Sequence, residues 1–98
     1  MPMNLLENPR HPGEVLNELY LKPLNMGAVA CSHRLGVPGT LIERIVKGQA
    51  NMTSDTALRL ARLFSTTPTY WVNLQTNSDM AKASRRVDLS IIEPLPRA

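Results

Sequence analysis

Charged and hydroxyl side chains gather in one short segment, HRLGVPGTLIERIVKG, which runs from His33 to Gly48. Four of them recur at intervals of three or four residues: Thr40, Glu43, Arg44 and Lys47. A helix would bring all four to one face. Arginine can donate a pair of hydrogen bonds to guanine, and lysine can neutralise a phosphate. Contact with a polyanion is therefore one candidate role for this segment.

Two short helices and a tight turn are needed to position that face. The stretch GAVACSHRLG predicts a helix that ends at Gly36, a residue suited to the left-handed conformation. Pro38 is expected to begin a second helix, which buries Ile42 and Ile45 and ends at Gly48. This arrangement is what a helix-turn-helix needs in order to place a helix in the major groove of DNA. The same spacing is equally consistent with an αα-corner whose outer face contacts only water.

The sequence contains few residues that could form a catalytic or metal-binding site. Cys31 is the single cysteine, which excludes an internal disulfide and a multi-thiolate metal site. It falls on the packed face of its helix, and His33 has no partner at metal-ligand spacing. A small hydrolase or redox enzyme that uses Cys31 with His11 or His33 is a rival hypothesis, but no base, orienting group and cleft can be assembled from these spacings. We expect no catalytic residue, metal, cofactor or small-molecule substrate.

Length and composition indicate one folded domain. The chain has 98 residues, of which 43% are hydrophobic and 19% charged, and its net charge is +3. This length allows one modest core, and the positive charge permits a polyanionic partner. No apolar run approaches the ~20 residues that a membrane span requires, so no membrane association is expected. The single cysteine and the lack of a signal peptide favour the cytoplasm.

Three further helices are predicted around the central pair. The first begins at Pro12, ends at Pro23 and carries an apolar stripe of four residues: Val15, Leu16, Leu19 and Tyr20. The second is capped by Thr53, and the third is capped by Thr67 and reaches Arg86. The predicted fold class is therefore all-α, with five helices around one core.

The predicted boundaries divide the chain into three parts. Residues 1–10 form an N-terminal arm, and residues 11–86 form the helical domain. Residues 87–98 switch to β-branched side chains and prolines, which indicates an extended C-terminal tail.

Several stretches resemble one family of helix-turn-helix proteins. They are HPGEVLNELYLKPL, LGVP, IVKGQANMT and TSDTALRLARLFSTTPTYWVNLQ, and together they cover roughly Asn8 to Arg86. These stretches resemble the HigA antitoxins, also called virulence-associated protein I-like, within the Cro/C1-type group. The resemblance implies a lambda-repressor-like domain that binds double-stranded operator DNA as a homodimer and represses its own operon. It also implies that the protein neutralises a RelE-like (HigB-like) toxin, an endonuclease that acts on messenger RNA.

The resemblance assigns roles to residues of the central segment. Three are expected to approach base edges: Thr40, Glu43 and Arg44. Lys47 and Gln49 are expected to meet phosphates, and Pro38 and Gly39 to position them. Large apolar side chains on the last helix predict core packing or a dimer interface there: Tyr70, Trp71 and Leu74.

Departures from the family pattern leave an alternative open. Gly27 and Ala28 stand where a capping Ser and a phosphate-binding Gln are usual, and Glu43 brings negative charge toward phosphates. Ser32 stands where a small Ala is usual, which its hydroxyl allows if it bonds a backbone carbonyl one turn back. The alternative is a toxin-binding interaction module, or a solitary regulator, with weak or lost DNA binding.

Overall fold

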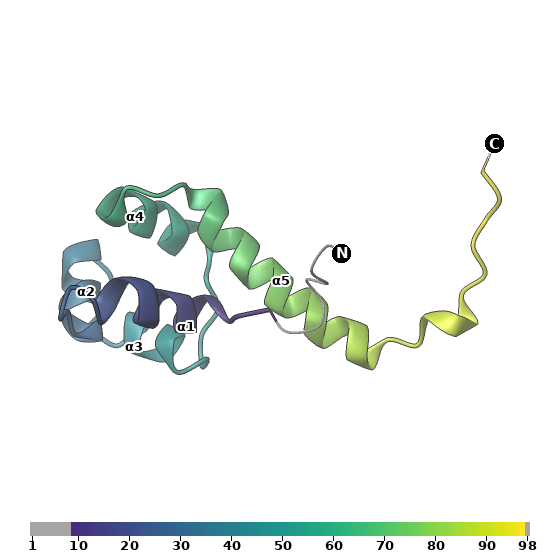
Figure 1. Ribbon diagram of the computed structural model, residues 1–98, viewed down its shortest axis with the longest axis horizontal. Coiled ribbons are helices and arrows are strands. Elements are labelled where there is room, and N and C mark those ends of the chain that lie inside the picture. Colours follow the sequence, from purple (N-terminus) through teal and green to yellow (C-terminus); the bar gives the residue numbers. More distant parts are fainter. Residues whose placement is uncertain (1–8, 98) are drawn as a thin grey trace.

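The computed structural model describes residues 9–97, and this part of the chain contains helices and no strand (Figure 1). Five α-helices and two short helical turns follow one another: α1 (Pro12–Leu16), η1 (Asn17–Leu21), α2 (Ala28–Leu35), α3 (Leu41–Val46), α4 (Ser54–Phe64), α5 (Pro68–Arg86) and η2 (Leu89–Ile91). The predicted all-α fold with five helices is confirmed. The predicted N-terminal arm, residues 1–10, lies outside the described residues except for its last two positions.

The helices form a small body from which α5 extends. In that body, α1 packs against α3 and α5, α2 against α3 and α4, and α4 against the beginning of α5. The far end of α5 and the chain that follows it extend away from the other helices, as Figure 1 shows. The molecule is therefore elongated, with principal extents of 52 × 28 × 25 Å.

The centre of the core is a group of aromatic side chains. Trp71 of α5 is fully buried, and its ring centroid lies 5.1 Å from that of Tyr20 and 5.0 Å from that of Tyr70. Phe64 packs against Tyr20, with their ring centroids 5.0 Å apart. The indole Nε1 of Trp71 donates to Oγ1 of Thr66 at 2.8 Å, which satisfies its one polar group. This cluster joins α5 to η1 and to the end of α4.

A π-helical turn changes the buried face of the first helix. The chain passes from α1 into η1, where backbone bonds join residues five apart, as from Met26 to Leu21 and from Lys22 to Asn17. The wider turn brings Leu21 into the core, whereas Leu19 is 54% exposed. The predicted stripe of Val15, Leu16, Leu19 and Tyr20 is therefore wrong at Leu19, because it assumed α-helical spacing throughout.

A glycine allows α1 to approach α3 very closely. Gly13 lies in the first turn of α1, and a Cβ atom placed there would overlap the backbone carbonyl of Ile45. Ile45 is fully buried near the end of α3. The close contact fixes α3 against the domain through backbone atoms, and any side chain at position 13 would push the two helices apart.

The tail after α5 makes one short turn and is otherwise exposed. η2 is a single 3₁₀ turn, and the carboxylate of Asp88 accepts from the backbone N–H and the hydroxyl of Ser90, at 3.1 and 2.6 Å. Every residue from 87 to 97 is exposed. The tail predicted to be extended from residue 87 onward thus contains one helical turn that its residues do not predict.

Candidate nucleic-acid interface

The turn between α2 and α3 is set by glycine and by backbone bonds. Gly36 follows α2 in the left-handed region, with φ of 72°. Its N–H donates to the carbonyl of His33 at 3.2 Å, and the N–H of Val37 donates to the carbonyl of Ser32 at 3.1 Å. These two bonds close the end of α2 in the Schellman pattern. The predicted end of this helix at Gly36 is confirmed.

The second helix begins later than its sequence suggests. α3 starts at Leu41, and the N–H of Leu41 donates to the carbonyl of Pro38 in a turn. Pro38 and Gly39 therefore belong to the connecting turn, and Thr40 is the residue that precedes the helix. The prediction that Pro38 opens the helix is wrong, because a proline at the first position of a turn has the same backbone preference as one at a helix start.

Ser32 joins the two helices directly. Its Oγ is fully buried within α2 and accepts from the backbone N–H of Ile42, at 3.2 Å. That N–H lies in the first turn of α3, where the helix itself provides no acceptor. The hydroxyl was expected to bond a carbonyl one turn back, but it instead fixes the first turn of α3 to α2.

Arg59 of α4 holds the turn from the other side. Its Nη1 donates to the carbonyl of Leu35 at 2.7 Å and lies 3.4 Å from that of Gly36, while its Nε donates to Asp55 at 2.7 Å. The spacing of residues in α4 gives no sign of this contact. Arg59 satisfies a carbonyl at the end of α2 and so couples α4 to the turn.

The polar residues predicted to meet DNA lie together on the outside of this motif. Thr40, Arg44, Lys47 and Gln49 are exposed, as is Pro38 in the turn, whereas Glu43 and Gly39 are half-buried. Thr40, Glu43, Arg44 and Lys47 share one face by their spacing of three and four residues. Within this face, Nζ of Lys47 lies 3.7 Å from Oε1 of Glu43, and the pair is solvent-exposed on both sides. Glu43 therefore offsets part of the positive potential that Lys47 contributes.

Two residues of α2 adjoin this face and were missed in the sequence. A Cβ at Gly39 would lie 3.6 Å from Nε2 of His33 and 3.9 Å from Cγ1 of Val29. Both side chains are exposed. His33 had been considered as a metal ligand and as a catalytic partner of Cys31. The signal that could have placed it here is its position one turn before Gly36, on the side opposite Cys31.

The start of α2 presents bare backbone donors. Gly27 precedes the helix in an extended conformation and supplies no side-chain cap. The first N–H groups of a helix without a cap remain available for an anion such as phosphate. The loss of side-chain capping predicted from Gly27 is thus observed, but its consequence is a free helix terminus.

Other chemistry has little support in the described residues. Cys31 is fully buried, and burial raises the pKa of its thiol to about 11, so it is not a nucleophile at neutral pH. Residues 9–97 hold no group of three His, Cys, Asp or Glu side chains that could bind a metal ion. Within the same range, no helix has the length and hydropathy needed to cross a bilayer.

The three residues predicted as a dimer interface occupy different environments. Trp71 is fully buried within its own chain, so its side chain has no surface to offer a second copy, and its predicted interface role is wrong. Tyr70 and Leu74 are half-buried and pack at the edge of the same core. The rings of Tyr20 and Tyr70 pack against the indole, with centroids 5.1 and 5.0 Å from it.

Comparison with known proteins places this motif in a family. The chain is similar to virulence-associated protein I of Dichelobacter nodosus, with 43% identity over 86 residues, which cover 87% of this chain and 80% of that protein. The antitoxin HigA of Pseudomonas aeruginosa, solved with the higBA promoter, matches with a TM-score of 0.84 and 32% identity over 91% of this chain and 100% of that chain. An addiction module antidote protein of a HigA family from Coxiella burnetii matches with a TM-score of 0.81 and 36% identity, over 90% of this chain and 99% of its own. The chain belongs to the HigA family.

The named relatives agree with the helix-turn-helix geometry of this chain. The resemblance stated from sequence is confirmed, although no family model matches the chain. The relatives are antitoxins and helix-turn-helix transcriptional regulators, which are not enzymes. In this HigA-family chain, Ser32, Arg59 and Gly13 hold α2 and α3 in place, and none of these roles was assigned from the sequence.

Proposed function

We propose that this HigA-family chain is an antitoxin and operator-binding repressor, and that it reads DNA with the outer face of α3. The observation that carries the proposal is the set of polar side chains on the outer face of a helix that is fixed at its start by the Ser32 hydroxyl and near its end by the backbone of Gly13. The Pseudomonas aeruginosa HigA structure, solved with its promoter, supports a DNA role for a chain of this shape. Thr40, Glu43 and Arg44 approach base edges, Lys47 and Gln49 meet phosphates, and Pro38 and Gly39 set their position.

The proposal includes two protein partners. A second copy of the chain forms a homodimer, with Tyr70 and Leu74 of α5 among the contact residues, since both remain partly exposed on the helix that extends from the body. A RelE-like mRNA endonuclease is the toxin that the protein neutralises, which the antitoxin name of its relatives supports. A two-fold dimer would present two copies of α3 to two half-sites of one operator.

Two substitutions on α3 test the DNA role, because they are expected to differ in kind. Lys47→Ala should weaken binding to operator and random duplexes alike and reduce the slope of log K against log salt by about 1. Arg44→Ala should cost about 1 to 3 kcal/mol on the operator and relax the preference at one base pair in each half-site. Fluorescence anisotropy on promoter and scrambled duplexes at several salt concentrations measures both effects.

The exposed position of both side chains provides the control for folding. Neither Arg44 nor Lys47 contributes to the buried core, so circular dichroism should be the same for both variants and the parent. If both variants bind the promoter duplex as tightly as the parent, α3 is not the reading helix and the proposed interface is wrong.

A second candidate function is a toxin-binding module with weak DNA binding. The contact between Glu43 and Lys47 favours it, because the carboxylate competes with phosphate for the ammonium group. Glu43→Gln should then tighten binding to DNA by removing both the competition and the repulsion. A parent chain that binds its toxin but binds its promoter and random duplex only weakly, with affinity for DNA gained in Glu43→Gln, would support this candidate.

A further inference from the structure

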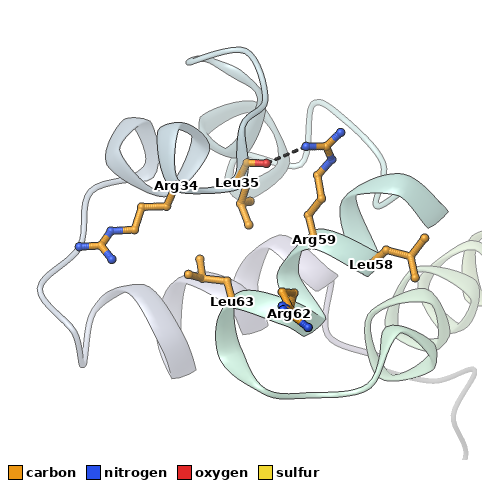
Figure 2. Close-up of a pocket in the computed structure, with 6 residues that line it drawn as sticks. All are labelled: Arg34, Leu35, Leu58, Arg59, Arg62 and Leu63. Carbon is orange, nitrogen blue, oxygen red and sulfur yellow. Dashed lines mark hydrogen bonds between the residues drawn. The ribbon is translucent and has the colours of Figure 1, made fainter.

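A groove of about 350 Å³ lies between α2 and α4, and none of its lining residues belongs to α3. It is lined by arginine and leucine side chains: Arg34, Leu35, Leu58, Arg59, Arg62 and Leu63. Figure 2 shows Leu35 and Leu63 turned toward each other across the space between the two helices. We call this surface the arginine–leucine groove.

The arginines of the groove are not equivalent. Arg59 is engaged by Asp55 and by the carbonyl of Leu35. Arg34 and Arg62 are exposed, and within residues 9–97 neither has an ion-pair partner. Two guanidinium groups are therefore available to carboxylates at the rim of an apolar surface.

The leucines indicate that the occupant of the groove has apolar groups as well as negative charge. Leu58 is 60% exposed in the groove, although all of α4's other leucines and alanines are buried or half-buried. A phosphate backbone gains nothing from an apolar lining, whereas a peptide with both carboxylates and aliphatic side chains would use both parts. The fitting partner is thus an extended acidic and aliphatic segment.

The C-terminal tail of the same protein has this chemistry. Asp88 and Glu93 are its two carboxylates, and its one cation, Arg97, follows the second of two prolines. Its aliphatic side chains are largely exposed, at 50, 65, 80, 61 and 89%: Val87, Leu89, Ile91, Ile92 and Leu95. Such a run of apolar surface in water favours burial against a partner.

We propose that the tail of a second copy of this chain docks in the arginine–leucine groove, with Ile91 and Ile92 on the leucines and Glu93 beside Arg62. The chain's own tail is too short to do so. The groove lies near the start of α5, and this 19-residue helix spans about 28 Å. Fully extended, the five residues from Val87 to Ile91 reach back only about 18 Å.

An antiparallel pair of α5 helices would bring the two parts together. Leu63 of the groove is near the end of α4, just before α5 begins, and the tail leaves from the other end of α5. If two copies pair their α5 helices in opposite directions, each tail emerges beside the groove of the other copy. The inference rests on the proposed homodimer, to which it adds a second contact, but not on DNA binding.

Disulfide trapping in the full chain tests the docking. Leu58→Cys in one copy and Ile91→Cys in another are mixed and exposed to oxidised glutathione. The native Cys31 does not interfere, because it is fully buried and burial raises its pKa to about 11. We expect a heterodisulfide between positions 58 and 91 as the main cross-linked product, identified by mass spectrometry.

Matched variants show whether the contact is specific. Leu24→Cys, which is 57% exposed in the parent and does not line the groove, should give at least tenfold less cross-link with Ile91→Cys. Adding Arg62→Glu to Leu58→Cys should lower the yield several-fold. Adding Glu93→Arg to the Ile91→Cys partner should then restore it.

Each contrary result overturns the inference in a recognisable way. Equal cross-linking of positions 24 and 58 would mean random collision of a mobile tail. A chain that is dimeric by sedimentation yet gives no 58–91 product would keep the homodimer and reject the docking, and a monomeric chain would reject both. If Arg62→Glu weakens binding to DNA and leaves the cross-link unchanged, the groove arginines contact phosphate instead.

Discussion

Gly13 has the tightest packing of any glycine in the described residues, and its substitution should be costly. A Cβ at this position would overlap the carbonyl of Ile45, so Gly13→Ala must separate α1 from α3. Overpacking of this kind costs about 1 to 3 kcal/mol of unfolding free energy. Urea unfolding followed by circular dichroism should show the loss as a lower midpoint.

A second glycine supplies the control for that experiment. A Cβ at Gly27 would have no neighbour within 4 Å, and the residue precedes α2 without a side-chain cap. Gly27→Ser should therefore be neutral or stabilise the protein by a few tenths of a kcal/mol through capping. Equal destabilisation by both substitutions would mean that backbone freedom, rather than the contact with Ile45, explains the effect.

Ser32 is the residue whose loss should link stability to DNA binding. Ser32→Ala leaves the buried N–H of Ile42 without its acceptor, which costs about 1 to 3 kcal/mol of stability. It also frees the first turn of α3, so affinity for the promoter duplex should fall together with the urea midpoint. Ser84→Ala, which removes an exposed hydroxyl at the end of α5, should change neither by more than ~0.5 kcal/mol. If stability falls by the expected ~1 to 3 kcal/mol while DNA affinity is unchanged, the bond does not position α3.

The ends and buried faces of some helices could be predicted from their sequences, and those of others could not. The end of α2 at Gly36 and the burial of Ile42 and Ile45 followed from local rules, because left-handed glycine and helical spacing act within one turn. The exposure of Leu19 did not, because the π-helical turn is stabilised by packing that local spacing does not encode. The late start of α3 was missed because Pro38 suits a turn as well as a helix.

At the scale of α1, the N-terminal cap should make stability depend on pH. Nδ1 of His11 accepts from the N–H of Gly13 at 2.9 Å, which only the neutral imidazole can do. The pKa of His11 is lowered from its ordinary value of 6.5, first by burial and then by the charge of Lys82, against the opposing effects of Asp79 and Glu14. The unfolded chain therefore binds the proton more readily than the folded one.

The sign of the effect follows from that difference. The contribution of His11 is fully present above its unfolded pKa and is lost as pH falls through the lower folded pKa. Unfolding free energy should thus decrease between pH 7.5 and pH 5. His11→Asn keeps an acceptor at the cap without a titrating group, so its stability should vary less over the same range. An equal pH dependence in both proteins would assign the effect to other groups.

At the scale of the whole molecule, the sequence predicted a helical domain but not which surfaces of its helices pack against one another. Trp71 was interpreted as an interface residue from its size, and the indole is buried against Tyr20, which lies 51 residues before it. The arginine–leucine groove brings α2 and α4 together, and neither helix alone indicates it. The burial of Trp71 and the arginine–leucine groove both result from contacts between separate helices. The spacing of residues along the chain does not predict such contacts.

The spacing of the operator should depend on this whole-molecule geometry. A two-fold dimer holds its two α3 helices at a fixed distance, and successive major grooves on one side of B-DNA recur every ~34 Å, or about 10 base pairs. We therefore expect the preferred duplex, selected from a random pool, to be an inverted repeat whose half-sites are centred one turn apart or a multiple of it. Inserting 5 base pairs between the half-sites would turn one of them to the opposite side of the duplex, whereas inserting 10 would restore the side.

The two insertions should separate a rigid dimer from two independent domains. With 5 added base pairs, one α3 helix of a rigid dimer loses its half-site, which now faces the opposite side of the duplex, and affinity should fall at least tenfold in the anisotropy assay. With 10, the half-site faces the correct side but lies ~34 Å further away, beyond the fixed span of the dimer, so affinity should stay low. The body of each chain is held together by the core around Trp71 and by the contacts of Ser32 and Arg59, so α3 has little freedom to follow a rotated half-site. Equal affinity for all three duplexes would mean that each chain binds DNA alone, and the homodimer would then play no part in recognition of the operator.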